Sequence, residues 1–434
     1  MKQLTRLFIP ICLETLFYML SGMVDTLMLS AVGDYAVGAV GTANSYIGIF
    51  IIMFSIISSG MVSVMTQNIG AGRPGVAYQA RQLGLLFNAV AGVLMAVFLF
   101  SGAGAILRMV GIADALYEPA LIYLKIVGGG CILNAVIPIF SSYLRAFGYT
   151  KQPLYATIVG NIANFVMNAV FLFVLHKGVA GVATATVISK ILNLCIVLYF
   201  SHKLISAKNS TERIANKTVL GQIVKVGLPS ACETALYNVA MMLVIRFLNQ
   251  MDAEGLNVTA RSYTATISNF SYCVGAALAQ ANAIMTGWHI GAGELEECDR
   301  GTKRAAFVGV CVAVCIETAI VLGSGFIMPL FTDNPEMTAL VRKLLAIDIV
   351  LEIGRVTNLV FGQALKTSGD AVFPAVIAAV FMFVFAVGGT WLFGISMGLM
   401  AVGAYIGLAS DECVRAVGMV WRWKTGKWRT KKLV

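Results

Sequence analysis

The tetrapeptide IGAG at residues 69–72 returns unchanged at residues 290–293, 221 positions further along the chain. A second pair of segments, LRAFGYTKQP at 144–153 and LKTSGDAVFP at 365–374, shares Leu, Gly and Pro at the same spacing. Landmarks that recur in one order and at one distance indicate an internal repeat. The sequence therefore predicts two equivalent halves, an arrangement by which membrane transporters expose one site alternately to either side of the membrane.

Each half also begins with a proline followed four residues later by a glutamate. Pro10 and Glu14 match Pro229 and Glu233 at a spacing of 219. The two glutamates are candidates for the cavity where the halves meet. The alternative is a position near the membrane interface at a helix start, where the helix dipole favours a carboxylate.

The repeat sets the expected domain boundaries. We expect an N-terminal six-helix lobe at 1–201 and a C-terminal six-helix lobe at 222–434. The polar segment 202–221 between them is predicted to be a cytoplasmic linker, because its basic side chains can lie against anionic lipid headgroups. The tail WRWKTGKWRTKKLV at 421–434 is basic and aromatic, which is typical of an anchor at the membrane interface.

The composition is that of an integral membrane protein. Of the 434 residues, 59% are apolar and 12% are charged, whereas soluble domains carry about 25% charged residues. A backbone in lipid must satisfy its own hydrogen bonds, and the long continuous apolar segments favour helices over the short alternating strands of a barrel. We therefore expect an all-α polytopic membrane protein with twelve transmembrane helices, in two six-helix repeats related by a pseudo-two-fold axis along the membrane normal. The expected spans are about 7–30, 38–66, 83–106, 120–143, 153–175, 179–201, 222–248, 257–286, 305–330, 338–363, 372–394 and 398–421.

The net charge of +10 comes from basic residues that are concentrated in alternate connecting segments. Alternate connecting segments, with the two ends of the chain, hold 22 of the 31 Lys and Arg, and the intervening segments hold six. The positive-inside rule then places both termini in the cytoplasm, as an even number of spans requires. This placement argues for a membrane-lipid partner and against nucleic acid, although a minor RNA-binding role of the basic, aromatic tail is an alternative.

Soluble-enzyme chemistry has no visible place in the chain. GAGRPG at 70–75 fits the dinucleotide-binding pattern by letter, but it follows a membrane span instead of a strand, and the copy at 291–297 lacks the third glycine. The sequence contains no Walker motif and no Ser/His/Asp arrangement. Its nine cysteines lack a metal-binding spacing. We expect no enzyme activity, no cofactor, and no metal beyond a coupling ion.

An acidic residue inside an apolar span is the strongest functional signal. Asp25 lies in SGMVDTLML at 21–29, and a carboxylate at the centre of a membrane helix costs roughly 3 kcal/mol on insertion scales. Such residues usually face an aqueous cavity or a partner, so Asp25 is a candidate coupling residue. The alternative is a hydrogen-bonded interior aspartate. The repeat-equivalent position holds Val244, so the halves differ chemically.

Three asparagines, Asn161, Asn164 and Asn168, share one face of the span 153–175 because they are spaced by three and four residues. Asn carbonyls can bind a hard cation beside a carboxylate. Alternatively, they form interhelical hydrogen bonds worth under about 1 kcal/mol each. The matching segment VIAAVFMFVFAVGG at 376–389 has no polar side chain, which predicts that ion handling belongs to the N-terminal half.

The second half carries a different set of buried charges. Glu352 and Arg355 are three residues apart and can pair on one helical face. Arg415 can pair in the same way with Asp411 or Glu412. The favoured interpretation of such pairs is that they fix helix packing, and a role in a substrate cavity is the alternative. Glu317 and Asp348 complete the set.

Several segments resemble those of the multidrug and toxic compound extrusion (MATE) transporter family, and the resemblance covers essentially the whole chain. In that family's first helix an Asp follows a Pro by fifteen residues, as Asp25 follows Pro10 here. TQNIGAGRP at 66–74 and LRAFGYTKQP at 144–153 resemble family turns. FVMNAVFLF followed by GVAGVATAT resembles its fifth and sixth spans, and LKTSGD the equivalent turn in the second half.

The resemblance implies two six-helix lobes around a central cavity in the bacterial cytoplasmic (inner) membrane. It further implies an antiporter, expected to be a monomer, that exports amphipathic organic cations or drugs by alternating access in exchange for H⁺ or Na⁺. By motif position, the family's N-lobe cation site falls on Asp25, Asn164, Asn168 and Thr186.

The second half departs from the family pattern. Several family members have an acidic residue on their tenth helix, and the matching position here is Arg355. They also have a glutamate on their seventh helix, whose matching position here is nearer to Tyr237 than to Glu233. Glu352 is a candidate replacement. Two alternatives stay open: a flippase for a lipid-linked saccharide or another amphipathic lipid, and a receptor or scaffold that transports nothing.

Overall fold

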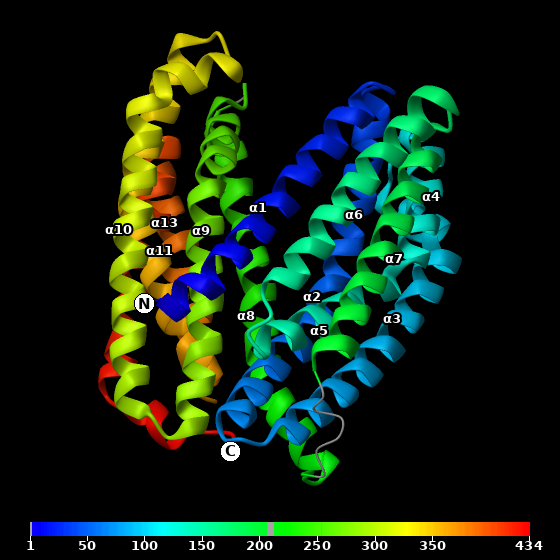
Figure 1. The fold of residues 1–434 in the computed structure, drawn as a ribbon. Helices are drawn as coiled ribbons and strands as arrows, with labels where there is room; N and C mark the ends of the chain where they lie inside the picture. Colours follow the sequence, from blue (N-terminus) through cyan, green and yellow to red (C-terminus); the bar gives the residue numbers. More distant parts are fainter. Residues whose placement is uncertain (1, 206–211, 253) are drawn as a thin grey trace. The chain divides into compact units, whose positions relative to one another are not determined.

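The computed structural model describes residues 2–205, 212–252 and 254–434, and these residues are almost entirely helical and contain no β-strand. The chain forms two compact units (Figure 1). The first unit is Ile9–Gly227, and the second is Leu228–Val434 with Met1–Phe8. Of the predicted linker 202–221, residues 206–211 lie outside the described residues, and a helix already begins at Asn216.

The first unit contains the helices drawn in blue to green in Figure 1. They are α1 (Lys2–Ser30), of which residues 2–8 belong to the second unit, α2 (Asp34–Gly70), α3 (Pro74–Val110), α4 (Asp114–Gly129), α5 (Cys131–Ala146), α6 (Lys151–Ala169) with the π-helical η1 (Val170–Val174), and α7 (Gly178–Leu204).

The second unit contains most of α8 and the remaining helices, drawn in green to red. They are α8 (Asn216–Met251), α9 (Leu256–Ala292), α10 (Leu295–Ile327) with η3 (Met328–Leu330), α11 (Pro335–Thr367), α12 (Val372–Phe381) with the π-helical η4 (Met382–Val387) and η5 (Thr390–Ser396), α13 (Met400–Lys424) and η6 (Lys427–Thr430).

These elements make up twelve long helical segments among the described residues, when α4 and α5 are joined and the short turns are added to the helices that they continue. Eight helices are long and apolar enough to cross a membrane, and a ninth crossing is the α4–α5 pair, bent by 41°. The predicted single span 120–143 is broken there because Gly128, Gly129 and Gly130 follow one another, and glycine is a poor helix former.

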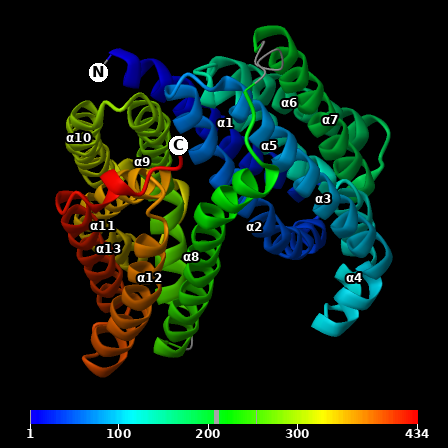
Figure 2. The same cartoon turned by 90° about the horizontal axis from the view of Figure 1, so that it is seen from below.

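The three long helices of the second unit that fall short of this apolar standard, α9, α11 and α13, pack extensively against one another. They lie side by side in Figure 2. Each carries buried polar or charged side chains, including Ser271, Asp348 and Arg415. The second unit therefore holds a polar interior among helices that would be poor spans if each faced lipid alone.

The repeated glycines of the sequence have the same backbone role in both halves. Gly72 and Gly293 have φ angles of 74° and 79°, and Gly148 and Gly369 have φ angles of 84° and 95°. A positive φ is strained for residues with a Cβ atom and free of that cost for glycine. The two repeated motifs are thus two left-handed turns between helices, each used twice.

The repeat also contains a matched ion pair that the sequence analysis did not anticipate. Glu14 on α1 pairs with Arg145 at the end of α5, with 2.6 Å between Oε1 and Nη2. Glu233 on α8 pairs with Lys366 at the end of α11, with 2.8 Å between Oε2 and Nζ. Arg145 and Lys366 are equivalent by the 221-residue spacing. In each half, an ion pair therefore connects the first long helix to the repeated turn that contains Gly148 or Gly369.

We expect reversal of one charge in this pair to destabilise the protein and reversal of both to restore it. Glu14→Arg places two cations together and should cost about 2 kcal/mol, the usual scale for a hydrogen bond to a charged group. Glu14→Arg with Arg145→Glu should recover most of that loss. Thermal melting of the detergent-solubilised protein measures both variants.

The matched control is the exposed pair of Glu297 and Arg300, whose side chains are each 56% accessible. Exchange of that pair should change stability by less than about 1 kcal/mol, because water screens it. If the double variant, Glu14→Arg with Arg145→Glu, has a melting temperature no higher than that of Glu14→Arg alone, the pairing does not stabilise the fold.

Candidate functional site

A polar cavity of about 620 Å³ lies within the first unit. Helices α1, α2, α4, α5, α6 and α7 all contribute to its walls. Two acidic residues, Glu14 and Asp25, and two basic residues, Arg145 and Lys190, line it. Its neutral polar lining includes Asn44, Tyr123, Asn134, Asn161, Asn164 and Thr186.

Asp25 is held in this cavity by hydrogen bonds between α1 and α6. Asn168 Nδ2 donates to Asp25 Oδ1 at 2.8 Å and lies 3.1 Å from the Oδ1 of Asn164, to which it also donates. Asn168 is fully buried and Asn164 is 5% exposed, whereas Asp25 is partly accessible. The structure therefore brings together three of the four residues that the family pattern placed at a cation site.

Thr186, the fourth predicted residue, lines the same cavity from α7. Its hydroxyl donates to the Val182 carbonyl at 2.9 Å. Tyr123 on α4 lies beside both Thr186 and Asn44. Neither Tyr123 nor Asn44 was predicted, because an isolated Tyr or Asn in an apolar span has no spacing signal.

The local backbone explains part of this arrangement. Asn168 sits one residue before the end of α6, where the chain continues as the π-helical η1. Such wide turns in a helix often occur at functional sites because they redirect side chains. Asn161, two turns earlier, donates instead to the Phe17 carbonyl of α1 at 2.9 Å. Asn161 thus has the interhelical role that was the alternative for these asparagines.

Lys190 is the most important cavity residue that the sequence analysis left unassigned. It lies one helical turn after Thr186 on α7, and its Nζ donates to Asn134 Oδ1 at 2.8 Å. Among the described residues, Asp25 forms no ion pair with Lys190 or with any other cation. A lysine inside a predicted span was the signal that could have located it, since such residues usually face a cavity.

A second cavity of about 440 Å³ lies within the second unit. Tyr237, Glu233 and Arg355 line it, whereas Glu352 does not line it and is fully buried. Its ionisable lining comprises four acidic and three basic residues, namely Glu233, Asp348, Asp411, Glu412, Arg261, Arg355 and Arg415.

The expected ion pairs of this region are present. Arg415 contacts Asp411 Oδ2 and Glu412 Oε1, each at 2.7 Å. Arg355 donates to Glu352 and lies 3.8 Å from Glu412. The Arg415 pairs lie within α13 and the Arg355–Glu352 pair lies within α11, whereas the contact between Arg355 and Glu412 joins the two helices. This last contact is of the kind expected if the charges fix helix packing.

The two units differ at the position of Asp25. Its repeat equivalent, Val244, is fully buried in an apolar cluster with Leu248 and Ala260. The position equivalent to Asp25 therefore has no polar side chain in the second unit.

Comparisons with known proteins match this architecture. The sequence profile of the MatE family matches residues 10–170 and 229–392. The chain is 32% identical over 428 residues to the uncharacterised transporter YisQ of Bacillus subtilis (strain 168), covering 97% of this chain and 94% of that protein. It is 20% identical over 446 residues to the probable multidrug resistance protein NorM of Thermotoga maritima, covering 100% of this chain and 94% of that protein.

Solved structures show the same fold. An outward-facing multidrug resistance MATE transporter of the MOP superfamily superposes with a TM-score of 0.85 at 21% identity, over 98% of this chain and 96% of that chain. A MOP superfamily transporter from Pyrococcus furiosus gives a TM-score of 0.84 at 20% identity, over 99% of this chain and 96% of that chain. The all-α membrane fold expected from the sequence is confirmed.

Proposed function

This chain belongs to the MatE family of multi-pass membrane transporters, and from that premise we propose that it is a cation-coupled antiporter. It exports amphipathic organic cations or drugs by alternating access and takes up Na⁺ or H⁺ in exchange. We place it in the bacterial cytoplasmic membrane with both termini in the cytoplasm, as the charge distribution of its connecting segments predicts.

One observation carries the proposal: a membrane-embedded carboxylate, Asp25, is held by Asn168 in a polar cavity and forms no direct ion pair among the described residues. An unpaired carboxylate in a membrane is costly. It gains most from a cation or proton that arrives through the cavity, which is the behaviour that coupling requires.

The neighbouring groups suit a small monovalent ion. The Oδ1 atom of Asn168 is buried and has no hydrogen-bond partner in the described part of the chain, and Thr186 lines the cavity that holds Asp25. Carboxylate, amide and hydroxyl oxygens are the ligands of hard cations. Lys190 lines the same cavity and donates to Asn134 instead of to Asp25.

The second cavity supports a cationic, amphipathic substrate. Its lining has one more acidic than basic residue, and it also includes Met241, Tyr272 and Met382. Aromatic faces attract cations, and methionine adapts to ligands of varied shape. A flippase for a lipid-linked saccharide would need a strongly basic cavity, and the charged lining residues of neither cavity are predominantly basic.

Exchange follows if cation and substrate favour opposite states of the transporter. One monovalent charge that moves through about 100 mV supplies roughly 2.3 kcal/mol. At about 1.4 kcal/mol per decade, this energy supports a gradient of about 40-fold for one-to-one exchange of a neutral substrate.

Ethidium efflux from cells that express the protein tests the proposal. We expect efflux to exceed that of empty-vector cells, and to fall to their level when the coupling gradient is removed. Replacement of external Na⁺ by choline and addition of a protonophore separate the two candidate ions. Efflux that continues unchanged when both treatments are combined would exclude cation coupling.

A further inference from the structure

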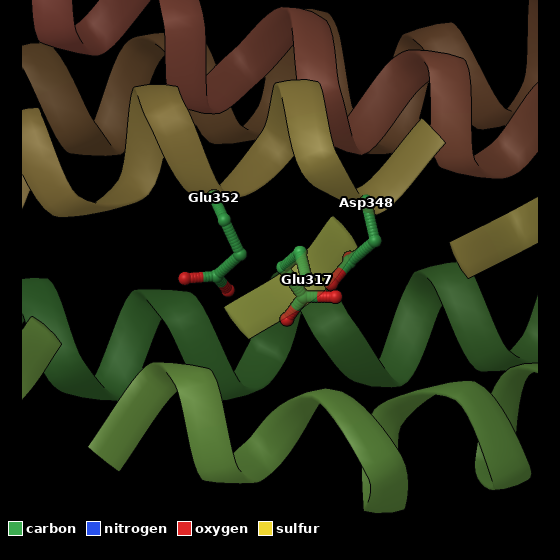
Figure 3. A group of neighbouring side chains, drawn as sticks. All are labelled: Glu317, Asp348 and Glu352. Carbon is green, nitrogen blue, oxygen red and sulfur yellow. The ribbon is translucent and has the colours of Figure 1, made fainter. Parts of the chain in front are cut away.

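Three carboxylates meet in the second unit without taking part in the coupling scheme above. Glu317 extends from α10, and Asp348 and Glu352 extend from α11 toward it (Figure 3). One oxygen from each lies within 4.8 Å of the others. We call these three residues the carboxylate cluster. All three are at least 98% buried.

Most oxygens of the carboxylate cluster have no partner. Both oxygens of Glu317, the Oδ2 of Asp348 and the Oε2 of Glu352 are buried without a hydrogen bond to any described residue. In the described part of the chain, Arg355 is the one cation in direct contact with the cluster, and it donates to the Oε1 of Glu352. Buried ionic groups left in this state are strongly unfavourable, because desolvation is not offset by a counter-charge or a hydrogen bond.

Two hydroxyl groups on α9 give an independent indication of a ligand. Ser271 lies beside Glu317 and Ser268 lies beside Asp348, and both serines are at least 96% buried. Each hydroxyl is close enough to its carboxylate to interact with it, but neither forms a hydrogen bond of good geometry within the described residues. On the same helix, Thr264 donates in the usual way to the carbonyl four residues earlier, at 2.8 Å.

The charge balance of the region requires additional positive charge. The carboxylate cluster, Asp411 and Glu412 contribute five acidic groups. The basic groups that contact them or line the same cavity are Arg261, Arg355 and Arg415. Two negative charges are therefore in excess when all groups are ionised. Such an excess cannot persist in a membrane interior, so the cluster must take up metal ions or protons.

We propose that the carboxylate cluster, with the hydroxyls of Ser268 and Ser271, forms a second cation site that binds a hard metal ion of the size of Na⁺ or Ca²⁺. Calcium lies about 2.3–2.6 Å from its oxygen ligands, so oxygens up to about 5 Å apart can share one ion. The spacing of the cluster agrees with that limit. The site draws on three neighbouring helices, α9, α10 and α11, so a bound ion would hold them together.

Asp348 gives the site a route to the aqueous phase. It belongs to the carboxylate cluster and also lines the 440 Å³ cavity, as does Ser268. Glu317 and Glu352 do not line that cavity. An ion can therefore enter from the cavity past Asp348 and be enclosed by the two glutamates, which is the arrangement expected of a bound ion and not of a surface counter-ion.

Thermal melting and isothermal titration calorimetry of the full-length purified protein, after treatment with a chelator, test this site. We expect NaCl or CaCl₂, compared with choline chloride at equal ionic strength, to raise the melting temperature saturably. The calorimetry should show stoichiometric binding that is retained in Asp25→Asn, which removes the carboxylate of the first cavity. This retention separates the second site from the proposed coupling site, so either can fail alone.

Glu317→Gln and Ser271→Ala should each weaken metal binding at least tenfold. Glu317→Gln should also melt higher than the wild type in the absence of metal, because it relieves repulsion among like charges, and this shows that the variant is folded. Ser271→Ala keeps every charge and removes one ligand. The control, Glu336→Gln, changes an exposed carboxylate at the start of α11 and should bind as the wild type does.

Two results would overturn the proposal. One is unchanged metal binding in both Glu317→Gln and Ser271→Ala. The other is a wild-type protein that is stabilised by acidification alone and by neither NaCl nor CaCl₂, which would show that protons balance the charge of the cluster.

Discussion

Asp25→Asn is expected to reduce ethidium efflux to the level of empty-vector cells while leaving the protein folded in the membrane. The substitution changes charge and little else. Asn168 donates to Asp25 Oδ1 at 2.8 Å, and the amide oxygen of an asparagine can accept the same hydrogen bond. The contact between α1 and α6 is therefore kept, whereas the site loses its negative charge and its ability to exchange a proton or cation.

The expected loss is complete because coupling is not divided among several carboxylates in the first unit. The other acidic residue of its cavity, Glu14, is already paired with Arg145. Without a cation cycle, the roughly 2.3 kcal/mol per charge at about 100 mV is no longer available to drive export.

The matched control is Asp114→Asn, which makes the same chemical change at an exposed position at the start of α4. It should transport at the wild-type rate. Equal expression and a single gel-filtration peak for both variants exclude misfolding as the cause. Normal ethidium efflux by Asp25→Asn would remove this residue from the coupling mechanism.

Arg415→Met is expected to cause the largest loss of stability. Arg415 is 4% exposed and holds two buried carboxylates, Asp411 and Glu412, each at 2.7 Å. Its removal leaves both acids without their main counter-charge, and breaking a buried pair in this way typically costs about 3–5 kcal/mol. A fall in melting temperature on the order of 10 °C follows for a unit of this size.

Two comparisons identify the cause of that loss. Arg304→Met removes an exposed arginine of α10 and should melt within about 2 °C of the wild type. Asp411→Asn added to Arg415→Met should recover part of the stability, because one uncompensated charge is then neutral. A melting temperature for Arg415→Met equal to that of Arg304→Met would show that the buried pairs do not support α13.

The fold was predictable because its determinants are local and repeated. The length of the apolar segments predicted the membrane helices. The two repeated segments, IGAG and the pair at 144–153 and 365–374, indicated equivalent halves. The left-handed backbone of their glycines, Gly72 and Gly293 among them, explains why glycine is repeated there. The break at Gly130 was not predicted, because a run of glycines inside an apolar segment is compatible with either one span or two helices.

The candidate site was predictable only in part. Asp25 and the asparagines of α6 were found because charge in a membrane and helical spacing are visible in one sequence. The partner of Lys190, Asn134, lies 56 residues earlier, and Ser271 approaches Glu317 from another helix. Such pairings depend on which faces of distant helices pack together, and no local pattern encodes that.

The most direct test of cation exchange is transport by the purified protein in proteoliposomes, with Na⁺ and pH gradients imposed separately. We predict that one of the two ion gradients drives ethidium across the membrane against the direction of ion flow in the wild-type protein. The same gradient should move no ethidium in Asp25→Asn. Ethidium movement at equal rates in both proteins, or in the wild type without either gradient, would contradict the account.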